Sequence, residues 1–228
     1  MQPLIDAFAY LTTSSHWTGA TGFAVRIAEH LGYTVLAVLA AALIAVPVGV
    51  AVGHTGKGAN AVIAISGALR ALPELGLLTW LAITLPRGIS WPIIPSLIVL
   101  VLLAVAPLLA GIVAGFESVE RDVVLSARAA GFSEKQILRD VELPLAAPVM
   151  LGGLRSCVVQ VLATATVVAY IGLGGLGRYL IDGLAMQDYA RMVAGAIVVT
   201  LLALVVDVLL AGVQRWATPN GLNVKENA

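Results

Sequence analysis

Charged residues are scarce in this sequence. Asp, Glu, Lys and Arg together make up 26 of the 228 residues, or 11%, whereas soluble globular domains carry about 25%. Apolar residues make up 60%, and the mean hydropathy is +0.98. These values exclude an ordinary soluble domain and favour a membrane protein. The net charge of zero offers no basic surface, so no nucleic-acid partner is expected.

Residues that commonly bind metals or cofactors are also scarce. The one cysteine, Cys157, lies in an apolar stretch, so it cannot form an intramolecular disulfide and is expected to be a small buried side chain. The three histidines, His16, His30 and His54, lie near expected loops and form no pair at catalytic spacing. We therefore expect no metal site, no cofactor and no catalytic residue in this chain.

Five long, nearly uncharged runs stand out, and a helix needs about 20 apolar residues to cross a membrane. They predict an all-α, polytopic transmembrane bundle with five spans, or six if the second run divides into two helices. The predicted spans lie near 32–53, 59–85, 93–115, 144–170 and 191–214.

The predicted membrane domain covers residues 32–215. Residues 1–31 are expected to form an extracytoplasmic or interfacial segment, either an amphipathic helix at 23–30 with Trp17 as an anchor or a loosely ordered leader. Residues 216–228 are expected to be a cytoplasmic tail.

Four charged residues lie well inside predicted spans: Arg70, Glu74, Arg155 and Asp207. Ionisable side chains at bilayer depth are costly, and they usually face protein or a water-filled cavity. They are therefore candidates for a transport pathway. Arg70 and Glu74 are four residues apart and could instead form a structural pair, provided that Pro73 does not interrupt the helix.

A glycine-rich stretch, IGLGGLG, occupies residues 171–177. It superficially suggests a dinucleotide-binding fingerprint, but no strand–helix–strand unit surrounds it. A flexible extracytoplasmic turn near the pathway fits the pattern better, so Gly174 and Gly175 join the candidates.

Residues 116–143 form a charged island, in which ten of 28 residues are Asp, Glu, Lys or Arg. Apolar residues at helical spacing predict a first short helix up to Ala130, and Gly131 predicts its end. Ser133 and Gln136 have the spacing of a capping box that opens a second short helix. Leu143-Pro144 is expected to close that helix, with Pro144 opening the next one.

The same island resembles the EAA motif of ABC transporter permeases. Ala127 and Gly131 are followed, at the family's spacing, by Val141-Glu142-Leu143-Pro144, although Leu125 stands where the family has Glu. The stretches VELPLAAPVMLGGLR and IGLGGLG are similar to the branch that imports glycine betaine, choline and related osmoprotectants. The resemblance covers residues 30–219 and indicates the MetI-like family, the binding-protein-dependent transport inner membrane components.

This resemblance implies a multi-pass subunit in the bacterial cytoplasmic (inner) membrane, surrounded by the lipid bilayer. Its implied partners are cytoplasmic ABC ATPase subunits, a second permease subunit (identical or related) and an extracytoplasmic substrate-binding protein. ATP hydrolysis is expected on the partner, so the chain itself is not an enzyme. Residues 119–142 are implied to dock on the ATPase, with coupling residues Ala127, Arg128, Gly131, Val141, Leu143 and Pro144.

The implied substrate is a small osmoprotectant such as glycine betaine, choline or carnitine, or else another small zwitterion or an amino-acid-like solute. Quaternary ammonium ligands are usually held by aromatic cages. Because aromatic residues make up 6% of this chain, we expect tight recognition to lie on the separate binding protein.

Two other classes of function remain open. In an ATP-independent secondary transporter or channel, the charged residues within the spans would form an ion relay, but the sequence shows no inverted repeat. An enzyme acting in the membrane would need paired catalytic groups, which are not evident.

Positive charges predict the orientation. With the N-terminus outside and five spans, seven basic residues fall on the cytoplasmic side: Lys57, Arg121, Arg128, Lys135, Arg139, Arg215 and Lys225. Four fall outside: Arg26, Arg87, Arg178 and Arg191. The charged island is therefore expected in the cytoplasm.

Overall fold

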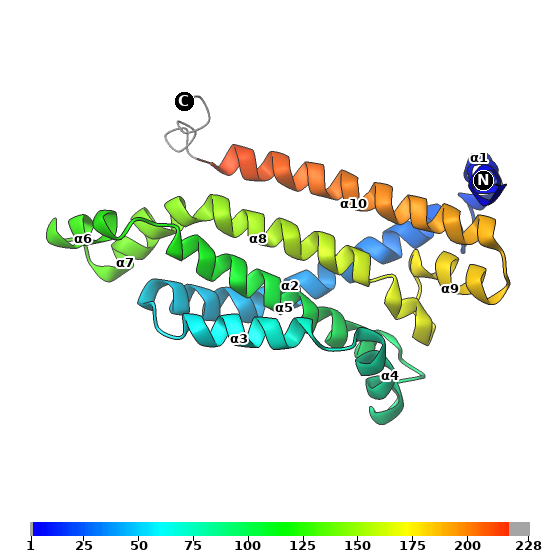
Figure 1. The fold of residues 1–228 in the computed structure, drawn as a ribbon, viewed down its shortest axis with the longest axis horizontal. Coiled ribbons are helices and arrows are strands. Elements are labelled where there is room, and N and C mark those ends of the chain that lie inside the picture. Colours follow the sequence, from blue (N-terminus) through cyan, green and yellow to red (C-terminus); the bar gives the residue numbers. More distant parts are fainter. Residues whose placement is uncertain (1, 219–228) are drawn as a thin grey trace.

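The structure is a computed structural model that describes residues 2–218, and within these residues it contains helices and no strands. Four helical runs are long and apolar enough to cross a membrane, and they lie side by side in an elongated bundle (Figure 1). They are α2 (Phe23–Thr55), α5 (Ile93–Glu117), the run Glu134–Ile171 that contains α8 (Leu143–Thr164), and α10 (Tyr189–Ala217). The predicted all-α transmembrane bundle is confirmed.

The second predicted span is broken. Helices α3 (Ala59–Arg70) and α4 (Glu74–Thr84) meet at an angle of 79° and together could form a fifth span. At about 1.5 Å per residue neither exceeds about 18 Å, well short of the bilayer's hydrocarbon core of about 30 Å. The six-span alternative is therefore excluded for this segment. Arg70 and Glu74 cannot share one helix face, because Pro73 lies in the break between the helices.

The two ends of the bundle carry different elements (Figure 1). One end holds the turn between α2 and α3, the C-terminal part of α10, and the short helices α6 (Arg121–Ala129) and α7 (Glu134–Gln136). The other end holds α1 (Gln2–Thr12), α4 and α9 (Gly177–Ala185). The elements predicted to be cytoplasmic thus lie at one end. Residues 219–228 of the predicted tail lie outside the described residues.

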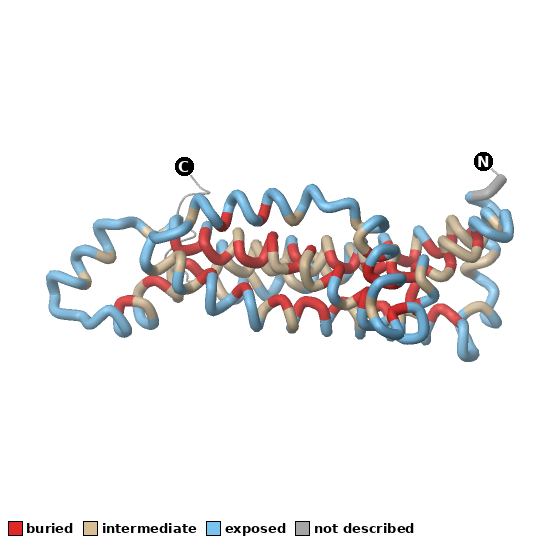
Figure 2. The backbone as a smooth tube through the Cα atoms, turned by 90° about the horizontal axis from the view of Figure 1, so that it is seen from below, coloured by how far each residue is buried: buried red, intermediate tan, exposed pale blue. Residues whose placement is uncertain are grey.

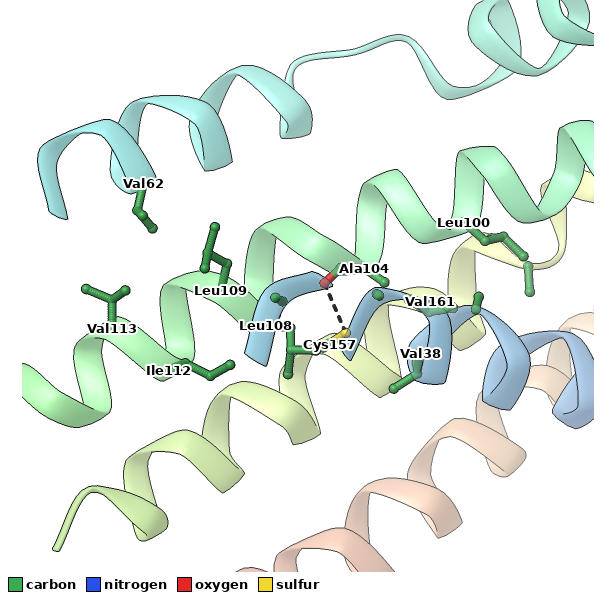
Figure 3. Packing of buried hydrophobic residues seen from close by; sticks show 14 of the residues in the cluster. Val38, Val62, Leu100, Ala104, Leu108, Leu109, Ile112, Val113, Cys157 and Val161 are labelled. Atoms are coloured by element: carbon green, nitrogen blue, oxygen red, sulfur yellow. Dashed lines mark hydrogen bonds between the residues drawn. The ribbon is translucent and has the colours of Figure 1, made fainter. Parts of the chain in front are cut away.

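Small residues allow the central helices to approach closely. On α2, Ala37, Ala41 and Ala45 recur every four residues and are fully buried, as expected of a packed face in a membrane bundle. A Cβ at Gly111 of α5 would come within 2.6 Å of the Gly153 Cα on α8, so the two backbones nearly touch there. Figure 3 shows the resulting core, in which the Cys157 thiol donates to the Ala104 carbonyl at 3.4 Å. The prediction that this cysteine is buried is confirmed.

Gly111→Ala is expected to lower the stability of the bundle. The added methyl group would push α5 away from the α8 backbone, and such overpacking typically costs about 1–3 kcal/mol. We expect a lower Tm in detergent, followed by thermal unfolding. Gly212→Ala on α10 is the matched control, because a Cβ there meets no atom within 4 Å. Equal Tm values for both variants would contradict this account of the α5–α8 contact.

The outer faces of the bundle are apolar. Large side chains such as Leu43 on α2 and Val208 on α10 are mostly exposed. The buried positions gather along the interior of the bundle (Figure 2). Soluble monomers rarely expose so many large apolar side chains on neighbouring helices. These faces fit contact with lipid or with another membrane subunit.

Two local predictions are wrong. Residues 23–30 do not form a separate interfacial helix, because they are the first turns of α2. The second helix of the charged island does not end at Leu143-Pro144 either. It continues through a π-helical turn, Ile137–Glu142, directly into α8.

Candidate functional site

The charged island forms a segment that protrudes from the bundle, and residues 119–136 are called the docking segment below (Figures 1 and 2). Helix α6 ends before Gly131, which has φ of +89°, a conformation that favours glycine. Ser133 Oγ accepts a hydrogen bond from the Gln136 backbone N–H, and Gln136 Oε1 accepts one from the Ser133 N–H at 2.9 Å. The predicted glycine joint and capping box are both confirmed.

An ion pair spans the glycine joint. Arg128 Nε donates to Glu134 Oε1 at 2.7 Å, and Arg128 Nη2 donates to Oε2 at 2.9 Å. The guanidinium hydrogen bonds hold the pKa of Glu134 below its ordinary value. Both side chains are exposed, and exposed pairs contribute little to overall stability. The bidentate geometry favours one orientation of α6 relative to α7.

The docking segment also exposes apolar side chains. Val123, Leu125 and Phe132 are all exposed, with 55% of Leu125 accessible, on a segment otherwise rich in charge. No residue of α6 is buried. Apolar side chains that are exposed amid polar ones mark protein interaction surfaces, so this surface fits a protein partner.

The six predicted coupling residues divide into two groups. Ala127, Arg128 and Gly131 lie on the docking segment itself. The other three, Val141, Leu143 and Pro144, lie at its base, where the π-helical turn runs into α8.

A contact at this base connects the docking segment to α2. His54, in the last turn of α2, donates from Nδ1 to Glu142, whose side chain is nearly buried. The partners are 88 residues apart in sequence, so no local pattern could have revealed the contact. The expectation that His30 lies near a loop is wrong as well: it is buried within α2 and its Nε2 lies 2.8 Å from the Leu162 carbonyl oxygen.

Two of the charged residues within the spans meet in the membrane domain. Arg155 on α8 donates to Asp207 on α10 through two parallel hydrogen bonds, Nε–Oδ1 at 2.5 Å and Nη2–Oδ2 at 2.6 Å. Both side chains are half-buried. A bidentate arginine–carboxylate pair fixes orientation as well as supplying attraction, so it ties α8 to α10.

This pair lies in an open polar groove of about 790 Å³. Gly111, Gly152 and Gly153 line the groove and have no side chains to fill it. The Gln214 amide also lines it and donates a hydrogen bond to the Pro148 carbonyl at 2.8 Å. The polar lining residues are Arg155, Ser156, Gln160, Asp207 and Gln214. Charges facing lipid at this depth would be costly. The groove therefore needs water or another protein over its open side.

The other four pathway candidates do not line this groove. Arg70 and Glu74 lie at the break between α3 and α4, and no ion pair joins them among residues 2–218. Gly175 is buried, and its N–H donates to Glu29 Oε2 at 2.7 Å. A Cβ at Gly174 would collide with the same carboxylate. The glycine-rich loop is thus packed against α2, which corrects the predicted flexible turn.

Comparisons with known proteins agree with this architecture. The family described as "Binding-protein-dependent transport system inner membrane component" matches residues 44–219. The choline transport system permease protein OpuBB of Bacillus subtilis is 34% identical over 85% of this chain and 88% of its own length. The carnitine transport permease protein OpuCB of Listeria monocytogenes is 33% identical over 87% of this chain and 89% of its own.

More distant proteins extend the match. The osmoprotectant import permease protein OsmW of Salmonella typhimurium is 30% identical over 96% of this chain and 100% of its own length. Among solved structures, a chain of the inward-facing MetNI methionine ABC transporter superposes with a TM-score of 0.72 at 20% identity. The superposition covers 84% of this chain and 94% of that one, and at this identity it supports the fold alone.

Proposed function

This chain belongs to the family of binding-protein-dependent transport system inner membrane components, and from that premise we propose that it is the permease subunit of an ATP-driven importer for a small osmoprotectant. The substrate class is a quaternary amine such as glycine betaine, choline or carnitine, because relatives at 30–34% identity carry these names. The alternative is another small zwitterion or amino-acid-like solute. The observation that carries the proposal is the protruding docking segment on a membrane bundle of this family.

The proposed ATP-hydrolysing partner docks on residues 119–142. The docking segment offers a rigid ion-paired joint and exposed apolar side chains, which suit a groove on a cytoplasmic ATPase. Leu125 stands at the position where the family has Glu, and its side chain adds to this apolar surface. ATP binding and hydrolysis on the partner would move the segment between two positions and thereby switch the pathway from one side of the membrane to the other.

We place the solute pathway along the groove that holds Arg155 and Asp207. Four or five spans make too little wall to enclose a pathway, so a second permease subunit is needed to cover the open side. Paired opposite charges present no net charge to the solute, which suits a zwitterion such as glycine betaine or carnitine. An extracytoplasmic binding protein would deliver the solute.

The proposed ATPase contact is tested by purification in detergent after expression with the products of neighbouring genes. We expect an ATPase to co-purify with the native chain and to be lost from the double variant Leu125→Asp, Phe132→Asp. Ser90→Asp, in the exposed turn at the opposite end, is the matched control and should retain the ATPase. Equal ATPase recovery with the native chain and the double variant would refute the assigned docking surface.

The groove makes a separate prediction about cysteine accessibility. Cys157 is fully buried, so a hydrophilic maleimide should not label the native chain in membranes. Neighbouring Ser156 lines the groove and is exposed. Ser156→Cys in a Cys157→Ala background should therefore be labelled, with Cys157→Ala alone as the blank. An unlabelled Ser156→Cys variant would contradict a water-filled groove.

A further inference from the structure

The docking segment is connected to α2 by a chain of polar contacts centred on His54. Its Nδ1 donates to Glu142 Oε2, and its Nε2 lies 3.6 Å from Glu134 Oε2. That same Glu134 oxygen accepts a hydrogen bond from Arg128 Nη2 at 2.9 Å. These contacts link the end of α2 to α6, and the 3.6 Å approach of His54 to Glu134 is the longest step.

Glu142 occupies an unusual position. Its carboxylate is only 7% exposed although it lies next to the solvent-exposed docking segment. A buried carboxylate that loses its hydrogen-bond partner is left unsatisfied, which is unfavourable. The hydrogen bond to His54 therefore holds Glu142 at the end of α2.

Glu142 also ends the π-helical turn at Ile137–Glu142. A π-helical turn replaces the i→i+4 hydrogen bonds of an α-helix with i→i+5 bonds, and such turns are frequent at functional sites. Ile137, at the start of the turn, is fully buried. The turn is thus anchored at both ends and joins the docking segment to α8.

The end of α2 that carries His54 is itself held firmly against α5. A Cβ at Gly49 would come within 2.8 Å of Ile112 Cγ2, and a Cβ at Gly53 would collide with the Phe116 ring. Contacts this close leave α2 little freedom to slide along α5. A displacement of His54 would therefore move α2 and α5 together.

We propose that His54 is the positioning residue that transmits movement of the docking segment to the membrane-spanning helices α2 and α5, through its contacts with Glu142 and Glu134. The inference rests on the proposed function, since it needs an ATPase that moves the segment. Without the imidazole, the exposed docking surface would be intact, but α2 would no longer follow it. ATP hydrolysis would then be uncoupled from transport.

The test uses the complete complex in proteoliposomes and measures ATP hydrolysed and labelled glycine betaine, choline or carnitine taken up by the same preparation. For His54→Ala we expect normal ATPase recovery and continued ATP hydrolysis. Uptake per ATP should fall at least about tenfold, the order of loss expected when a hydrogen bond to a charged group is removed. Lys57→Ala, exposed three residues later, should leave this ratio unchanged.

Two further variants separate positioning from folding. His54→Asn places an amide N–H near the position of Nδ1, so it should recover most of the uptake per ATP. In a double-variant cycle, Glu142→Ala should add little to His54→Ala, since each substitution alone removes the contact between His54 and Glu142.

Coupled uptake by His54→Ala at the native ratio would overturn the proposal. A parallel loss of ATPase recovery and uptake in both His54→Ala and His54→Asn would overturn it too, since it would show a docking or folding role. If the native chain recruits no ATPase, the proposed function fails before this inference is reached.

Discussion

Gly131→Pro is expected to abolish ATP-driven uptake while leaving the chain in the membrane. Gly131 has φ of +89°, whereas proline fixes φ near −65°. The substitution would also remove the hydrogen bond from the Gly131 N–H to the Arg128 carbonyl, 3.1 Å long. The angle between α6 and α7 would change, and Arg128 would lose its alignment with Glu134. Uptake by whole cells and the amount of chain in the membrane fraction are the two measurements.

Gly131→Asn is the matched control for this variant. Asparagine tolerates the left-handed conformation and retains the backbone N–H, and a Cβ at this position meets no atom within 4 Å. Near-native uptake is therefore expected. Native uptake by a well-inserted Gly131→Pro variant would refute the role assigned to the joint.

Asp207→Ala is expected to remove most uptake and to lower the amount of chain in the membrane. The substitution leaves Arg155 without the carboxylate that holds it through two hydrogen bonds, in a groove within the membrane domain. Breaking one side of such a pair is more harmful than replacing both sides. Quantitative blotting of membranes and solute uptake measure the two effects.

The double variant Arg155→Leu, Asp207→Leu separates a pathway role from a structural one. Replacing both charges with apolar side chains should restore membrane levels, because no unpaired charge remains. If the pair lines the solute pathway, uptake should still be lost. Recovery of native uptake by the double variant would show that the pair serves α8–α10 packing alone.

The sequence predicted those features that depend on local patterns. The uncharged runs predicted the long helices, because apolar length alone decides whether a helix can cross a bilayer. The joint at Gly131 and the capping box at Ser133 were predictable because each depends on residues close in sequence.

The remaining features depend on tertiary contacts that no local pattern encodes. Arg155 and Asp207 could be recognised as costly intramembrane charges, but their pairing depends on α8 meeting α10 across 52 residues. The contact between His54 and Glu142 crosses 88 residues. Pro144 predicted a helix start, yet a π-helical turn precedes it without a break. Pro73 predicted an interruption but not its 79° angle, and α4 packs on α5 through Leu78 and Leu103, which are distant in sequence.

The most direct test of the central claim is uptake of labelled glycine betaine, choline and carnitine into proteoliposomes that contain this chain with its co-purified ATPase and the extracytoplasmic binding protein. The account predicts uptake of at least one of these solutes that requires ATP and stops when the ATPase is omitted. Solute movement by the purified chain alone, without ATP, would contradict it and would indicate an ATP-independent transporter.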